Sequence, residues 1–224
     1  MYEEVPHTMR LIAISDTHGH HDTLDLPPGD VLVHTGDFCR YGDLAEAEAF
    51  LTWLASQPHP HKLLIAGNHD LAAEKMPDAF QALVPDNVIY LQDRAVEVDG
   101  RTFYGAPWTP EFCNWAFMLE RGEAIRAVWD KIPSETDVLL THGPPYGHND
   151  LAKAYKTAHQ RAVGCLELLR AVQRVRPLVH IFGHIHESYG ASMSDEVPGT
   201  QFVNASTCTL AYTPDNPPVV IDLP

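Results

Sequence analysis

Residues that can bind a divalent metal ion are concentrated at a few places along this chain. Asp16 and His18 stand in SDTHGHHD, and Asp37 stands in HTGD. The other donors lie in AGNHD, THGPP and GHIHE, and they are Asn68, His142, His184 and His186. These donors exceed the four that one zinc ion takes, whereas two cations that share one carboxylate would use them all. The residue types therefore predict a binuclear metal centre without thiolate ligands.

This donor set also limits the metal and the chemistry. Mixed nitrogen and oxygen ligands suit manganese, iron, nickel, cobalt or zinc and do not choose between them. We expect two divalent ions, with Mn²⁺ ranked first. A water that bridges two such cations loses a proton near neutral pH, and the cations neutralise charge that develops on a phosphoryl group. Such pairs of cations occur in phosphatases and nucleases, so hydrolysis of a phosphate ester is a reaction that this donor set would serve.

Each group of donors follows a short apolar run. The runs are RLIAIS, DVLVHT, KLLIAG, DVLLTH and LVHIFG, at residues 10–15, 30–35, 62–67, 137–142 and 178–183. They are rich in Val, Ile and Leu and do not alternate with polar residues, which is typical of strands buried on both faces. Ligands bind beyond the carboxyl ends of such strands, so we expect the donors to converge at one edge of a sheet.

The rest of the chain predicts an α/β fold. Helical spacing of apolar residues predicts helices over 43–57, 119–130 and 161–174. Residues 88–106 predict short antiparallel strands with a turn at Asp99-Gly100, and QFVNAS and PPVVIDLP predict further strands near the end. We expect one domain over residues 1–224, with enough extra strands for a second sheet packed on the first.

The charge and composition limit the classes of partner that the protein can bind. The formal net charge is −15, which disfavours long nucleic acids and anionic membranes because both are negatively charged. The sequence contains no apolar run long enough to cross a bilayer, the N-terminal MYEEVPHTMR is polar, and the four cysteines are scattered. We therefore expect a cytoplasmic protein with reduced thiols that binds neither long nucleic acids nor membranes.

The order of the motifs resembles a known family. D-x-H, G-D, G-N-H-D, THG and G-H-x-H occur in the order found in the calcineurin-like metallophosphoesterases. The stretches HTGDF, IAGNH, LTHGPP, VGCLELL, FGHIHE and NASTCT, together with the tail NPPVVIDLP, are similar to the metallophosphoesterase-domain (MPPED-type) phosphodiesterases. This resemblance extends from about residue 10 to the C-terminus.

The resemblance implies a two-sheet β-sandwich flanked by helices, in four αββα layers. It implies one metal held by Asp16, His18, Asp37 and His186, and a second held by Asp37, Asn68, His142 and His184. His69 would be a catalytic imidazole that binds no metal. The implied activity is a phosphodiesterase acting on small phosphodiesters, with cyclic and short nucleotides as candidates.

The chain departs from the phosphoprotein phosphatases of this superfamily at Arg40. Those enzymes carry G-D-x-x-D-R-G, whose second Asp orients the catalytic His, whereas this chain has GDFCRYG. Asp70 is the nearest substitute in sequence, although it would serve equally as the N-cap of a helix over DLAAEKM. We expect Arg40 to be either a surface charge or a phosphate contact, and Asn204 to lie beside the substrate.

Several alternatives remain open. THGHHD resembles the H-x-H-x-D-H motif of metallo-β-lactamases, but Thr23 replaces the final His. A phosphomonoesterase or a metal-binding scaffold with little turnover would use the same ligands. Trp108 and Trp115 would pack a long loop or form a wall for stacking a base. A structural or solvated role is expected for His34, His59, His61, His148, His159 and His180.

Overall fold

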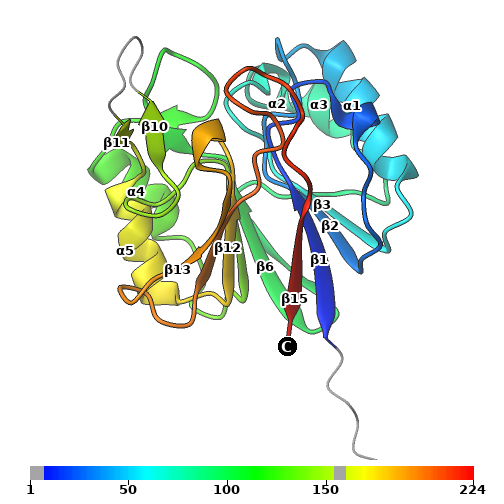
Figure 1. Ribbon diagram of the computed structural model, residues 1–224. Helices are drawn as coiled ribbons and strands as arrows, with labels where there is room; N and C mark the ends of the chain where they lie inside the picture. The colour runs from blue at the N-terminus through cyan, green and yellow to red at the C-terminus, as the bar shows by residue number, and fades with distance from the viewer. Residues whose placement is uncertain (1–7, 154–159) are drawn as a thin grey trace, which may run out of the picture.

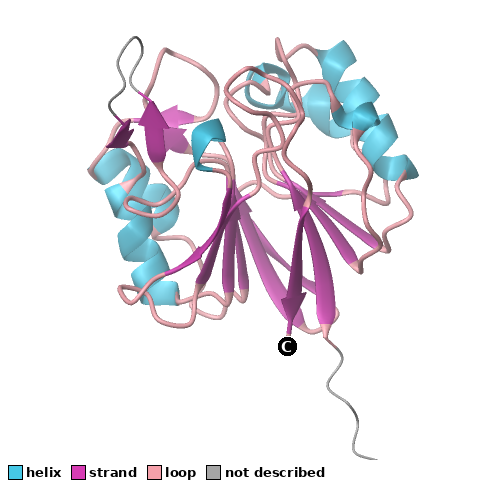
Figure 2. Ribbon diagram, in the orientation of Figure 1, coloured by secondary structure: helices cyan, strands magenta, loops and turns pink. Residues whose placement is uncertain are grey.

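The computed structural model describes residues 8–153 and 160–224, so His159 and most of the polar N-terminal segment lie outside the described residues. Within them, two large sheets lie face to face, and helices cover the outer side of each (Figure 1). Figure 2 shows the resulting order of layers, helix, strand, strand and helix, which is the predicted four-layer arrangement. No helix among the described residues is long and apolar enough to cross a membrane.

The first sheet is five-stranded in the order β15-β1-β2-β3-β4. These strands are Val219–Leu223, Met9–Ile14, Val31–His34, His61–Leu64 and Ile89–Tyr90. The second sheet is six-stranded in the order β13-β14-β12-β9-β6-β5. Its strands are Gly190–Met193, Gln201–Asn204, Val179–Phe182, Val138–Thr141, Arg101–Ala106 and Arg94–Val98. The five runs predicted as buried strands correspond to β1, β2, β3, β9 and β12, which are parallel within their sheets.

The prediction for residues 88–106 is correct for one pair of strands and wrong for another. Strands β5 and β6 are antiparallel, and the turn between them places Asp99 and Gly100 in the left-handed region. Strand β4, in contrast, pairs parallel with β3 in the other sheet. The cause is the connection, because the helices between β3 and β4 carry the chain back to the opposite end of the sheet, where β3 begins, so that β4 runs parallel to it.

Alternate residues of each central strand enter different apolar cores, which explains why their sequences are continuously apolar. In β1, Leu11 and Ala13 are buried in the core between the two sheets. Ile12 and Ile14 are buried on the opposite face, against the helix containing Phe50. Each fully buried side chain of this size contributes about 1.5–3 kcal/mol of transfer free energy. Packing on both faces therefore fixes the direction and register of the strands whose ends carry the donors.

The helices follow the predictions in position but differ at their starts. Helix α1 spans Leu44–Ser56, and the Asp43 side chain caps it by accepting from the Glu46 N–H at 2.8 Å. Helix α4 spans Glu123–Trp129 and α5 spans Leu166–Val175, later than predicted in both cases. Residues 160–162 form strand β11 instead, paired with β10. The remaining elements are α2 Leu71–Lys75, α3 Pro77–Leu83, β7 Thr109–Pro110, β8 Met118–Leu119, β10 Leu151–Lys153, β11 Gln160–Ala162, and 3₁₀ turns at His21–Thr23 and His186–Ser188.

Candidate metal centre

The seven predicted ligands lie just beyond strand ends of both sheets, at the edge where the sheets meet. Asp16 follows β1, Asp37 follows β2 and Asn68 follows β3. His142 and His184 follow β9 and β12 of the second sheet. Because these parallel strands end at a common edge, donors distant in sequence come together.

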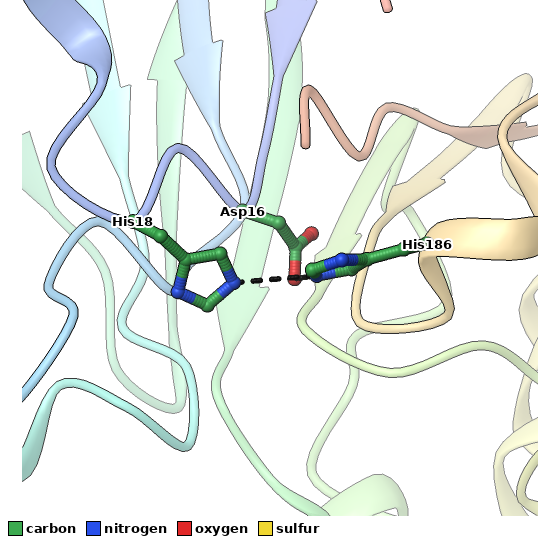
Figure 3. A group of neighbouring side chains, drawn as sticks. All are labelled: Asp16, His18 and His186. Atoms are coloured by element: carbon green, nitrogen blue, oxygen red, sulfur yellow. Dashed lines mark hydrogen bonds and ion pairs between the residues drawn. The ribbon is translucent and has the colours of Figure 1, made fainter. Parts of the chain in front are cut away.

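The first group of donors consists of Asp16, His18 and His186, whose ligand atoms all lie within 4.8 Å of one another. Figure 3 shows the three side chains pointing toward one another. The Nε2 atoms of His18 and His186 are 3.2 Å apart, and His186 Nε2 is 3.4 Å from Asp16 Oδ1. One divalent ion fits among these atoms.

The second group consists of Asp37, His142 and His184, also within 4.8 Å of one another. His142 Nε2 lies 3.3 Å from Asp37 Oδ2 and 2.9 Å from the side-chain oxygen of Asn68. Asp37 Oδ2 is also 4.0 Å from His18 Nε2, so the Asp37 carboxylate lies between the two groups. This is the position that a bridging ligand requires.

The second nitrogen of three ligand rings is held by the main chain. The Nδ1 atoms of His18, His142 and His186 lie 3.2, 2.9 and 3.0 Å from the carbonyl oxygens of Cys39, Thr35 and Thr209. Each Nδ1–H therefore donates to a carbonyl and leaves Nε2 directed at the other donors. Such bonds orient metal-binding histidines and fix their tautomer.

The arrangement brings the lone pairs of several nitrogen and oxygen donors close together, and positive charge among them is stabilising. Burial opposes protonation of His142, but the Asp37 carboxylate raises its pKa to about 9. The pKa of His186 is also raised, against burial, by its bond to Asp16. Burial and the charge of His142 lower the pKa of His184 to about 4, so that ring is neutral. The site therefore favours positive charge at His142 and His186, and the donor set fits a binuclear centre.

Left-handed backbone conformations and two glycines make this convergence possible. Asp16, Asp37 and His184 have positive φ angles of 51°, 57° and 68°. Such conformations cost energy in non-glycine residues and cluster at functional sites. A Cβ at Gly67 would collide with Asp37 and His142, and one at Gly183 would collide with Asp16. The glycines of the G-N-H and G-H-x-H motifs therefore allow the ligands to approach the backbone closely.

His69 lies at the edge of this centre. Its Nδ1 donates to the carbonyl oxygen of Arg40 at 2.9 Å, and its ring stacks on Trp115 with centroids 4.3 Å apart. Its backbone N–H donates to Asp37 Oδ1 at 2.7 Å. One ring nitrogen also lies within 4.8 Å of donors of His18 and Asp37. The bond to Arg40 fixes the ring and leaves Nε2 available to a substrate.

Asp70 is not the partner of His69, so its predicted role as a substitute for the missing carboxylate is wrong. Its side chain is buried and accepts the backbone N–H groups of Asp37, Cys39 and Gly67 at 2.8, 2.9 and 2.7 Å. It precedes helix α2 but makes no side-chain capping bond there. Asp70 therefore fixes two ligand-bearing loops, and the Arg40 carbonyl orients His69.

The two predicted substrate contacts, Asn204 and Arg40, differ in their outcome. Asn204 is fully buried, donating to the Ile185 carbonyl at 2.9 Å and accepting the Ser206 N–H at 3.1 Å. Asn204 therefore lies beside the site, as predicted, where it supports the loop that carries His184 and His186. Because it is fully buried and absent from the cavity surface, its predicted contact with a substrate is wrong. The guanidinium of Arg40 lies over the ring of Tyr41, 5.5 Å from its centroid, so its phosphate contact stays a prediction.

A cavity of about 490 Å³ opens above the centre. His18, Asp37, Asn68, His184 and His186 are on its surface together with His69. Its remaining wall is partly aromatic and cationic, formed among others by Phe112, Trp115, Tyr212, Arg121 and Arg161. The aromatic sequence PWTPEFCNW was a signal for Trp115, whereas Tyr212 and the arginines have no local signal. Trp108 packs against Phe117 instead, with its indole N–H bonded to Asp93.

Comparisons with known proteins agree with this geometry. A family model described as calcineurin-like phosphoesterase matches residues 9–188. The human and mouse proteins called metallophosphoesterase domain-containing protein 1 are each 43% identical over 254 residues, covering all of this chain and 76% of theirs.

Solved structures share the fold at low sequence identity. One has a TM-score of 0.67 at 13% identity and covers 97% of this chain and all of its own. The crystal structure of TT1561 from Thermus thermophilus has a TM-score of 0.59 at 13% identity, covering 88% of this chain and 89% of its own. With the five ordered motifs and the full-length relatives, these findings show that the chain belongs to the calcineurin-like phosphoesterase family and is of the metallophosphoesterase-domain type.

Proposed function

We propose that this protein is a binuclear metal-dependent phosphodiesterase that hydrolyses small phosphodiesters, with cyclic and short nucleotides as candidate substrates. The observation that carries the proposal is that Asp37 lies between two groups of metal donors, beneath a cavity of about 490 Å³. His69 lies beside them at the cavity surface.

The ligand sets divide between two ions. Asp16, His18, Asp37 and His186 would hold one cation, and Asp37, Asn68, His142 and His184 would hold the other. When bound, such ions supply a water of lowered pKa and neutralise charge on the phosphoryl oxygens. We favour Mn²⁺, with iron, nickel, cobalt and zinc as alternatives that the same donors accept.

His69 is the side chain that would donate a proton to the substrate. Its Nδ1–H is committed to the Arg40 carbonyl, so Nε2 is the atom that meets a substrate. As an imidazolium, His69 would protonate the departing alkoxide or donate a hydrogen bond to a phosphoryl oxygen. The stacking of Trp115 on the ring restricts its rotation. Asp37 adds a further restraint through the His69 backbone N–H.

The shape and charge of the protein favour a small substrate. The cavity wall carries the rings of Phe112, Trp115 and Tyr212, which offer faces for a nucleobase. Arg161 adds positive charge at the same wall. The net charge of −15 repels a long phosphate backbone. These features support a mononucleotide-sized diester over a polymer.

The test compares a diester with a monoester. We expect bis-p-nitrophenyl phosphate to be hydrolysed faster than p-nitrophenyl phosphate when Mn²⁺ is added to protein stripped of metal. Faster monoester hydrolysis would favour the phosphomonoesterase alternative. Two bound ions without turnover in any metal would favour the scaffold alternative. A panel of cyclic and linear nucleotides then identifies the substrate class.

The predicted cytoplasmic location of the protein is a separate matter and stays a prediction.

The role of His69 has its own test. Replacing His69 by Ala should lower kcat about a hundredfold or more, the usual contribution of general acid catalysis, while both metals stay bound. His61→Ala is the matched control, because His61 pairs with Asp99 away from the centre. Loss of a metal ion from the His69 variant would show that His69 is a ligand, since its nitrogen lies close to both groups.

A further inference from the structure

Two buried histidines that the proposed reaction does not use lie directly behind the metal centre. His34 is the last residue of β2 and His180 lies in β12, and neither is exposed to solvent. His34 Nε2 is 3.0 Å from the hydroxyl oxygen of Thr17, and His180 Nε2 is 2.8 Å from that of Thr141. Each of these threonines immediately precedes a ligand histidine.

The neighbouring bonds fix the direction of both contacts. The Gly36 N–H donates to His34 Nδ1 at 3.1 Å, so the proton of a neutral His34 is on Nε2 and is donated to Thr17. The Thr141 hydroxyl donates its single proton to the Gly143 carbonyl at 2.8 Å. It must therefore accept from His180 Nε2–H. Burial lowers the pKa of each imidazole to about 3, in agreement with two neutral rings.

The His34 contacts join two ligand-bearing loops. Thr17 lies between Asp16 and His18, and Gly36 directly precedes Asp37. Both loops contain left-handed residues, which the chain does not adopt without support from its surroundings. A single imidazole thus restrains the loop after β1 and the loop after β2.

The His180 contacts restrain a single ligand in the second sheet. His180 holds Thr141, and Thr141 holds the carbonyl of Gly143, so the residues on both sides of His142 are fixed. His142 is fully buried and reaches Asn68 and Asp37 across the space between the sheets. A small rotation of this turn would displace His142 Nε2 from both oxygen atoms.

We propose that His34 and His180 are positioning residues of the metal centre, each acting through a threonine hydroxyl on the main chain that carries a ligand histidine. The inference rests on the proposed function, because it assumes that metals bind at these donors. It assigns the Thr17 hydroxyl to the first metal and the Thr141 hydroxyl to the second, so the effects of the threonine substitutions should be separable.

The experiment measures Mn²⁺ and Co²⁺ binding by titration calorimetry, and the Co²⁺ absorption spectrum, independently of turnover. Thr141→Val removes the hydroxyl at nearly constant volume, whereas Thr141→Ser retains it. We expect Thr141→Val and His180→Leu to weaken the second metal by about tenfold or more, the usual cost of losing such a partner. Thr141→Ser should bind like the unmodified protein, and the two substitutions should be less than additive when combined.

A matched set tests the other contact. Thr17→Val should weaken the first metal by a similar factor, and Thr17→Ser should not. His34→Leu also removes the acceptor of the Gly36 N–H beside Asp37, so it should weaken both metals. His148→Leu is the control, because His148 is also a buried histidine but stacks on Phe202 and contacts no ligand. Its substitution should change thermal stability without changing the affinity for either metal.

The outcomes separate the two proposals. Unchanged metal affinity in Thr141→Val and Thr17→Val would overturn the positioning role while leaving the phosphodiesterase intact. Equal losses in the Val and Ser variants would do the same, because the hydroxyl would not be the cause. No metal bound by the unmodified protein would overturn both proposals. If the Leu variants fail to fold, the threonine series alone decides the question.

Discussion

The two sheets contribute different chemistry to the candidate centre. The first sheet supplies both carboxylates, the Asn68 amide and His18, and it also positions His69. The second sheet supplies only imidazoles, from His142, His184 and His186. Neither sheet holds a complete ligand set for either ion. Both carboxylates are therefore on the side of the first sheet, and a cation bound between the sheets would contact donors from each.

The largest effect is expected from Asp37, which lies between the two groups of donors and is proposed to bind both ions. Asp37→Ala should remove an anchor of each metal and lower kcat/KM by about a thousandfold or more, equivalent to about 4 kcal/mol of transition-state stabilisation. Metal content by elemental analysis should fall below one ion per chain. Asp99→Ala, at the exposed β5–β6 turn, is the control. Near-normal turnover would contradict a bridging role for Asp37.

Removing a ligand from the second sheet should affect only one ion. His184→Ala should release the second metal, retain the first and lower kcat by about a hundredfold, the cost of losing one main electrostatic contact. Elemental analysis should give one ion per chain in place of two. If His184→Ala loses both ions, the division of ligands proposed here is incorrect.

The affinity for the second metal should depend on pH, because His142, a proposed ligand from the second sheet, must lose a proton to bind it. His142 must be neutral to bind a cation, and its pKa in the metal-free protein is raised to about 9. Below that pH each metal bound at His142 displaces a proton, so affinity should increase about tenfold per pH unit up to about pH 9. Calorimetry in buffers of different ionisation enthalpy should detect this proton release. A flat profile from pH 7 to 9 would show that His142 is not a ligand.

Removing the metal ions with a chelator should produce the smallest of these effects, a decrease in thermal stability. Because each ion takes donors from both sheets, binding should oppose their separation. At a hundredfold excess over Kd, one ion adds about 2.7 kcal/mol, which raises Tm by about 5–10 °C for a chain of this size. Scanning calorimetry with and without EDTA measures the difference. An unchanged Tm, with metal shown to be bound, would mean that the sheets are joined equally well without ions.

The sequence predicted a feature correctly where the pattern that indicates it lies within one short segment of the chain. The continuous apolar runs predicted the central strands, because burial on both faces leaves that pattern in each strand separately. The ends of those runs located all the donors, because parallel strands place their carboxyl ends together. Strand β4 was misassigned because its two residues, Ile89 and Tyr90, carry no periodicity and its partner was decided by the helical connection.

Side-chain partners were much harder to predict, because they depend on how loops pack. Asp70 and Asn204 both stand beside motif residues, yet their polar atoms are used by backbone groups of other loops. His34 and His180 look like ordinary core histidines in sequence, since their threonine partners lie 17 and 39 residues away. The carbonyl that orients His69 belongs to the main chain of Arg40, so the residue type at that position gives no indication of this contact.

That carbonyl has a consequence for how the protein tolerates amino-acid change. A carboxylate that orients a catalytic histidine is lost whenever its residue is replaced. The oxygen that accepts from His69 belongs to the main chain of residue 40, which retains it whatever its side chain. The exposed side chain beside His69 is therefore free to alter in size and charge during divergence. New specificities could arise at that position while the imidazole keeps its alignment.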